Sequence, residues 1–211
     1  LVVLTCDGGT SETAPVKGFV LGSATLNPVL SSTNTITINK TGGTVTINAG
    51  VGTANGPSAT PDGMLYLNGA DYVTIDGLTF TDGNAASATV AMEFGIALFK
   101  RAAGDGCNNN TIQNCIFNMQ RINNGSGTTP MLDGSWGIEV LNSTAAAATT
   151  SLTPTNGGTL ATNGTNSANR FYTNTINSGN GGIGFGGYAA TVGVGPAPTA
   201  TTFLGDLGND V

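Results

Sequence analysis

Two short apolar blocks recur along this chain, and their recurrence constrains the fold more than any other feature. The first block is GMLYLNG at residues 63–69, and it returns as FGIALFK (94–100), WGIEVLN (136–142) and GGIGFGG (181–187). The second is YVTIDGLTF at 72–80, and it returns as NTIQNCIFN (110–118) and RFYTNTIN (170–177). Apolar residues alternate with others within the copies, which is typical of strands with one buried face. Because no copy can form a sheet alone, the copies are expected to pair with one another.

Aligned on their apolar residues, the copies form uniform columns. The first block gives Leu65, Ile96, Ile138 and Ile183, and also Leu67, Leu98, Val140 and Phe185. The second gives Ile75, Ile112 and Phe171, then a bend at Gly77, Asn114 and Thr173, then Phe80, Phe117 and Ile176. Constant strand blocks at variable spacing are typical of a solenoid, whose insertions leave through the turns. We therefore predict an all-β fold, a right-handed parallel β-helix of about four to six coils with loop insertions, its columns stacked about 4.8 Å apart.

The clarity of the repeats divides the chain into three parts of a single β-helix segment. Residues 63–188 carry the clear repeats, whereas the pattern does not fix the register of the N-terminal coils in 1–62. Residues 189–211 are expected to begin a further coil, so we expect the chain to be a segment of a longer protein. The uncharged stretch 142–168 is predicted to be an outward loop, and 85–94, bracketed by glycines, a loop or a single turn. Earlier strands are expected at Leu1–Thr5, Gly18–Leu21, around Ile36 and Ile38, and around Val45 and Ile47.

Composition excludes several classes of function. The formal net charge is −6, the six Lys and Arg residues are scattered, and there is no His. A nucleic-acid partner is not expected without a basic stripe, nor is a membrane span without an apolar run of about 18 residues. The lack of His argues against zinc and excludes a Ser-His-Asp triad. Three cysteines leave at least one unpaired: a Cys107–Cys115 bridge and a buried thiol at Cys115 are both open, and Cys6 lies far away in the sequence.

Three segments carry a family resemblance. GADYVTIDGLTF, NNNTIQNCIF, and ANRFYTNTINS followed by GGIGFGGY resemble the right-handed, pectin-lyase-like β-helix repeats of large secreted or cell-surface proteins of Bacteroidota. The resemblance covers roughly residues 63–188. It implies an extracellular or cell-surface location, type IX secretion, and a non-catalytic structural or adhesive module that contacts glycans or other proteins. Such a module could continue into further coils of its parent chain or assemble end to end.

The binding hypothesis depends on residues expected to point outward. Tyr66 holds the outward position of its block, and Ala97, Glu139 and Gly184 align with it on later coils. Such a column would form a shallow face beside an aromatic ring, which suits a sugar. The candidate ligand-binding residues are Tyr66, Trp136, Glu139, Tyr172 and Tyr188. Isolated exposed aromatic residues are also common on surfaces that bind nothing.

The alternative function is polysaccharide cleavage by a lyase or a glycoside hydrolase. Hydrolysis needs two carboxyl groups about 5 to 9.5 Å apart, and the candidates are Asp71, Asp76, Glu93 and Glu139. Asp76 precedes a glycine, which is equally typical of a turn. A lyase would use a basic residue and often Ca²⁺ held by clustered carboxylates. Lys100, Arg101 and Arg170 are expected to be solvated strand ends without an aligned acidic cluster, so we predict no metal site and no cofactor.

Overall fold

The computed structural model describes residues 1–53, 61–122, 134–148, 150, 152 and 164–187, which form three parallel sheets of five strands each. Sheet A contains β1 (Val2–Asp7), β4 (Ile36–Thr41), β7 (Val73–Asp76), β10 (Thr111–Gln113) and β13 (Arg170–Tyr172). Sheet B contains β2 (Ser11–Thr13), β5 (Thr46–Asn48), β8 (Thr79–Thr81), β11 (Ile116–Asn118) and β14 (Thr175–Ser178). Sheet C contains β3 (Phe19–Leu21), β6 (Gly63–Asn68), β9 (Phe94–Phe99), β12 (Trp136–Leu141) and β15 (Gly181–Gly186).

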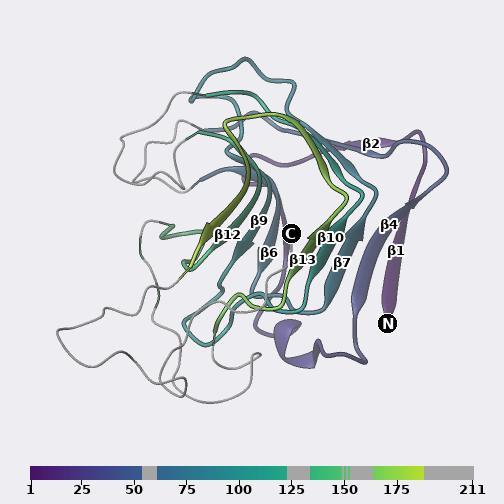
Figure 1. Cartoon of the computed structure of the whole chain (residues 1–211), viewed down its shortest axis with the longest axis vertical. Coiled ribbons are helices and arrows are strands. Elements are labelled where there is room, and N and C mark those ends of the chain that lie inside the picture. Colours follow the sequence, from purple (N-terminus) through teal and green to yellow (C-terminus); the bar gives the residue numbers. More distant parts are fainter. Residues whose placement is uncertain (54–60, 123–133, 149, 151, 153–163, 188–211) are drawn as a thin grey trace.

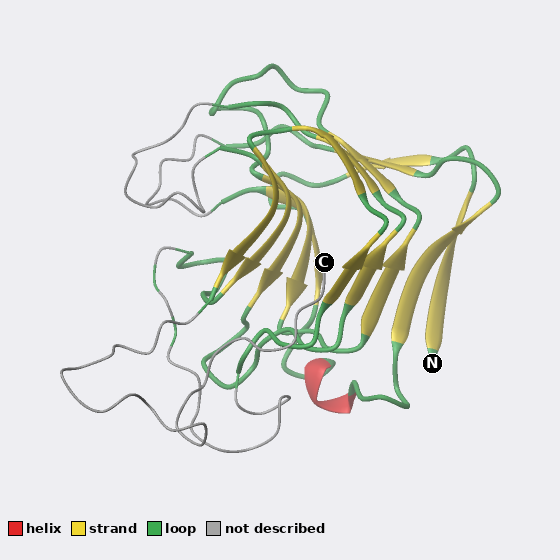
Figure 2. Cartoon of the chain, in the orientation of Figure 1, coloured by secondary structure: helices red, strands yellow, loops and turns green. Residues whose placement is uncertain are grey.

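The chain visits the sheets in the fixed order A, B, C, so each circuit is one coil and five coils stack side by side (Figure 1). Each strand pairs in parallel with its equivalent in the next coil. Among the described residues no segment is an α-helix, and the short 3₁₀ helix η1 (Asn27–Val29) lies beyond the lower ends of sheets A and C (Figure 2). The predicted all-β parallel solenoid is therefore confirmed, and the described residues form five coils.

Strand register confirms the predicted apolar columns. In sheet C, Leu65 pairs with Ile96, Ile96 with Ile138, and Ile138 with Ile183. The column of Leu67, Leu98, Val140 and Phe185 is also in register. The second-block columns continue into earlier coils, because Ile38 precedes Ile75 in sheet A and Ile47 precedes Phe80 in sheet B. One continuous apolar core therefore fills the coil interior.

Two stacked columns of left-handed residues form the tight corners. At the bend between sheets A and B, the predicted Gly77, Asn114 and Thr173 have φ of 78°, 54° and 49°. At the entry to sheet A, the equivalent positions are Tyr72, Asn109 and Ala168, with φ of 53°, 57° and 57°. The predicted strand start at Tyr72 was therefore wrong: Tyr72 forms the corner, and β7 begins at Val73.

The first coil lies at one end of the stack, and among the described residues no strand pairs with the outer edges of β1, β2 and β3. The expected strands appear as β1 and β3, and the two Thr- and Ile-containing runs become β4 and β5 in neighbouring sheets. The β2 strand was not predicted, because SET has no apolar alternation. Val2 pairs with Ile36 and Leu4 with Ile38, both on the apolar columns of sheet A. Val2 and Leu4 are nevertheless 53% and 51% exposed.

Several other predictions can be placed. The stretch 85–94 is a loop up to the start of β9, as predicted. The thiols of Cys6, Cys107 and Cys115 are free, and the last two are buried, so the Cys107–Cys115 bridge does not form. Most of the predicted outward loop and all of 189–211 lie outside the described residues. No helix in the described ranges is long and apolar enough to span a membrane.

Candidate functional site

The outer face of sheet C is covered, which overturns the prediction of an exposed sugar-binding column. Tyr66, Ala97 and Glu139 are in register on this face, but their exposed fractions are only 4%, 0% and 0%. The Tyr66 ring packs against Phe94 and Phe99, with centroid distances of 6.4 and 5.6 Å. Its hydroxyl donates a hydrogen bond to the Pro61 carbonyl at 2.8 Å. Tyr66, Phe94, Ala97 and Phe99 belong to a second apolar cluster, separate from the core that fills the coil.

A half-open hollow of about 340 Å³ lies beside this cluster. We call it the Tyr66 hollow; it is lined by Lys17, Val20, Pro61, Tyr66, Asn68, Phe99, Arg101, Thr144, Ala145 and Ala146. Most of its lining is apolar, and polar groups stand on its rim. The Lys17 ammonium lies 3.5 Å from the buried Asp62 carboxylate. The hollow therefore combines apolar walls with a few fixed polar groups, as small-molecule sites do.

A second hollow, of about 330 Å³, lies where the chain passes from sheet C towards sheet A. We call it the Asp71 hollow; it is lined by Asn27, Pro28, Leu30, Asp71, Arg101, Gly104 and Asp105. Arg101 lines both hollows, so the two adjoin. Its Nε donates to Asp105 Oδ2, and Asn27 Nδ2 donates to both oxygens of Asp105 at 3.1 Å. Asp105 is thus held by two donors.

Asp71 is the less neutralised carboxyl of the Asp71 hollow. It is 5% exposed, and its Oδ1 accepts hydrogen bonds from the Asn108 backbone N–H at 2.6 Å and side-chain amide at 3.2 Å. Among the described residues, no group donates to Oδ2. Burial raises the pKa of Asp71 to about 7; the Asn108 hydrogen bonds oppose this shift, and the Asp105 charge adds to it. Asp71 therefore exchanges its proton near neutral pH.

Packing at Gly69 holds this second hollow in shape. Its φ is +70°, and a Cβ there would lie 2.6 Å from Asp105 Oδ1 and 2.8 Å from Asn27 Nδ2. Only glycine combines that conformation with so close an approach.

Two predicted acids, Glu93 and Glu139, are buried together at sheet C. Glu93 precedes β9, and its Oε2 accepts a hydrogen bond from the Asp62 backbone at 2.8 Å. Both carboxyl oxygens of Glu139 are buried without a hydrogen-bond partner. Burial raises the pKa of Glu139 well above 4.5, and the charge of Glu93 adds to the shift. An unpaired buried carboxyl favours its neutral form.

Glu139 should make stability depend on pH. A carboxyl with a raised folded-state pKa contributes stability that is complete below the unfolded pKa of 4.5 and is lost as pH rises through the folded pKa. Glu139→Gln should therefore leave the urea midpoint nearly unchanged at pH about 4 and raise it at pH about 8. Glu12→Gln, at an exposed carboxyl of β2, is the control and should leave the profile unchanged. Parallel profiles for wild type and Glu139→Gln would contradict the assignment.

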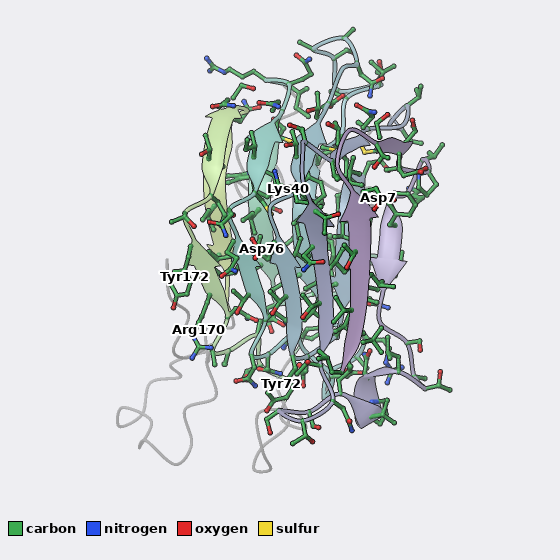
Figure 3. The ribbon with its side chains drawn as sticks, turned by 90° about the vertical axis from the view of Figure 1, so that its right-hand side faces the viewer. Asp7, Lys40, Tyr72, Asp76, Arg170 and Tyr172 are labelled. Atoms are coloured by element: carbon green, nitrogen blue, oxygen red, sulfur yellow. The ribbon has the colours of Figure 1, made fainter. Side chains whose placement is uncertain are left out.

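The remaining predicted residues lie apart from both hollows. Asp76 and Tyr172 are on the outer face of sheet A (Figure 3). There Asp76 accepts hydrogen bonds from Gln113 and Asn114 of the next coil, at 2.9 and 2.7 Å. Trp136 is half-buried against the outer cluster of sheet C, and Tyr188 lies outside the described residues. The four predicted acids therefore do not converge on one open surface.

Sequence reasoning missed residues of both hollows and misplaced a basic one. Asn27 and Asp105, which line the Asp71 hollow, were not singled out, although Asp105 follows Arg101 by four residues after a strand. Lys100 was expected to be solvated, but its side chain is fully buried. Arg101 stays partly exposed, with 34% of its side chain accessible, and Arg170 is exposed as predicted. Within the described ranges, no three His, Cys, Asp or Glu side chains are grouped to hold a metal ion.

Comparisons with protein-family models, curated proteins and solved structures found no match to this chain. The hollows and their chemistry are therefore the basis for any functional assignment.

Proposed function

We propose that this chain is a non-catalytic, right-handed β-helix module that binds glycan chains in the Tyr66 hollow. The observation that supports this proposal is the hollow itself. It is an apolar recess of about 340 Å³ whose lining includes the polar groups of Lys17, Asn68 and Arg101. Sugar rings have apolar faces and hydroxyl edges, so such a recess matches them. The resemblance to secreted Bacteroidota repeats supports an extracellular or cell-surface parent protein with an adhesive role.

The scaffold beneath the hollow suits presentation of a binding surface. Sheet C is held on one side by the stacked Leu, Ile, Val and Phe columns and on the other by the outer aromatic cluster. Because both sides are packed, the hollow should keep its shape without a ligand. A preformed site loses little conformational entropy on binding.

Filling the hollow should weaken glycan binding. Ala146 is exposed and lines the Tyr66 hollow, whereas its exposed neighbour Ala147 does not. We expect Ala146→Trp to weaken, by about tenfold or more, the binding of those glycans that the wild type binds on an array. The indole would occupy space that the ligand needs, and even one extra methylene in a pocket can change binding by this much. Ala147→Trp is the matched control and should bind like the wild type. Equal binding by both variants, or no glycan bound by the wild type, would overturn the proposal.

Polysaccharide hydrolysis is the second candidate, favoured by one observation. Asp71 and Asp105 line the same hollow, and their surroundings differ: burial raises the pKa of Asp71 to about 7, whereas Arg101 pairs with Asp105. Acid-assisted hydrolysis uses two carboxyl groups whose surroundings differ. Reading the same glycan incubations for new reducing ends separates the candidates, because a binding module releases none.

A further inference from the structure

The Asp71 hollow is built around a carboxyl that the protein leaves incompletely satisfied. Asp105 receives donors from Arg101 and Asn27, whereas both hydrogen bonds to Asp71 end on Oδ1. Asp71 is nine-tenths or more buried and lines the hollow. A buried carboxylate is strongly stabilised by a cation or a hydrogen-bond donor brought to its free oxygen. The hollow therefore favours a ligand group that donates.

The shape and composition of the Asp71 hollow indicate an organic cation. Calcium takes six to eight oxygen ligands, whereas this hollow offers two carboxyl groups, one of them already paired with Arg101. Pro28 and Leu30 give it an apolar wall, which suits the carbon skeleton of an organic ligand. Its volume of about 330 Å³ is at the lower end of the range for small-molecule sites.

The position of the Asp71 hollow links it to the glycan site. Arg101 lines both hollows, and Asn68, which lines the Tyr66 hollow, accepts a hydrogen bond on its carbonyl from Asn27 Nδ2 at 3.0 Å. A ligand chain lying in the Tyr66 hollow would therefore reach the Asp71 hollow past Arg101.

We infer that the Asp71 hollow binds the ammonium group of an amino sugar, so that the glycan recognised by this protein carries free amines. The inference builds on the proposed function, because the sugar chain itself would occupy the Tyr66 hollow. The ammonium would donate to Asp71 Oδ2 while Asn108 holds Oδ1. Arg101, engaged with Asp105, would not compete for Asp71.

Three β-1,4-linked oligosaccharides that differ only at C2 test the inference by calorimetry. Chito-oligosaccharide carries an amine, its N-acetylated form an amide, and cello-oligosaccharide a hydroxyl. We expect the amine to bind about ten- to a hundredfold more tightly than the other two, as a charge-assisted hydrogen bond predicts. Asp71→Asn should remove this preference. Asp76→Asn, on the outer face of sheet A, is the control and should retain it.

Proton release on binding provides a second measurement. It would not be seen if Asp71 had only a structural role. At pH about 6 the free protein holds most of the Asp71 proton, since its pKa is raised to about 7. Binding an ammonium there should release close to one proton, measured by titration in two buffers of different ionisation enthalpy. Asp71→Asn should release none.

The outcomes separate the two proposals. Equal affinity for all three oligosaccharides, or an amine preference that survives in Asp71→Asn, overturns the amino-sugar inference and leaves the glycan site intact. Failure of the two neutral oligosaccharides and of every array glycan to bind overturns the glycan site. Asp71-dependent binding of the amine with proton release supports the inference.

Discussion

Replacing Phe117 by alanine should lower the free energy of unfolding by about 3 to 5 kcal/mol. Phe117 is fully buried, and its ring stacks on Phe80 of the preceding coil at 5.2 Å and 8°. The backbone of β9 presses on the same ring: a Cβ at Gly95 would lie 2.4 Å from Phe117 Cδ1. Because these neighbours are fixed by strand pairing, the cavity cannot collapse. Urea denaturation measures the loss.

The neighbouring residue supplies the control for this prediction. Ile116 lies on the same strand, β11, but is 38% exposed. Ile116→Ala should therefore lower the free energy of unfolding by no more than about 1 kcal/mol. Similar losses in the two variants would show that the interior of the coil is not the main source of stability.

Replacing Asn110 by leucine should have an effect of similar size, for a different reason. Asn110 is 1% exposed; its Oδ1 accepts from the Val73 backbone at 2.8 Å, and its Nδ2 donates to the Ala70 carbonyl at 2.9 Å. Leucine fills the space but leaves both backbone groups unpaired. At about 1 to 3 kcal/mol for each group, we expect a loss of about 2 to 6 kcal/mol in urea denaturation.

Hydrogen exchange gives this second prediction a local readout. The Val73 amide should lose protection in Asn110→Leu before the amides of sheet B do. Asn177→Leu is the control, because Asn177 also donates across coils, to Asn118 Oδ1 at 2.8 Å, but is exposed. It should cost less than about 1 kcal/mol. Global loss of protection in Asn110→Leu without a local effect at Val73 would contradict the role assigned to this side chain.

The asparagines that bridge coils show what local sequence can indicate. Asn residues clustered near bends are compatible with stacked ladders and equally with local turn capping. The structure shows cross-coil bonds: Asn110 Nδ2 donates to Asn169 Oδ1 at 3.1 Å, and Thr173 Oγ1 donates to Asn114 Oδ1 at 2.6 Å. Deciding between the two roles requires the strand register, and the sequence of a single bend does not reveal that register.

The interior of the coil could be predicted from sequence because its physics is local and repeated. Each inward position, such as Ile96 or Ile138, meets its own equivalent in the next coil, so apolar residues recur in the same place. The outer face of sheet C does not follow this rule. Tyr66 is covered by Phe94, Phe99 and Pro61, which come from different segments and share no repeat position with it. Its burial therefore could not be read from alternation.

The Asp71 hollow was missed for a related reason. Asp71 was named as a candidate acid, but its partners lie in other coils: Asn27 follows β3, and Asp105 follows β9. Nothing in a strand pattern indicates which connections meet. The burial of Lys100 was missed for the same reason, because a basic residue at a strand end is expected to be solvated unless the segment that covers it is known.

The corners of the coil differ in how much chain they tolerate. Between sheets A and B, the last three coils turn through Gly77, Asn114 and Thr173, each immediately after a strand. The connections that leave and enter sheet C vary widely in length, and they border both hollows. Diversification of such a protein should therefore be asymmetric: new peptide can be spliced in around sheet C to alter what is recognised, while the A–B corner stays closed to insertion.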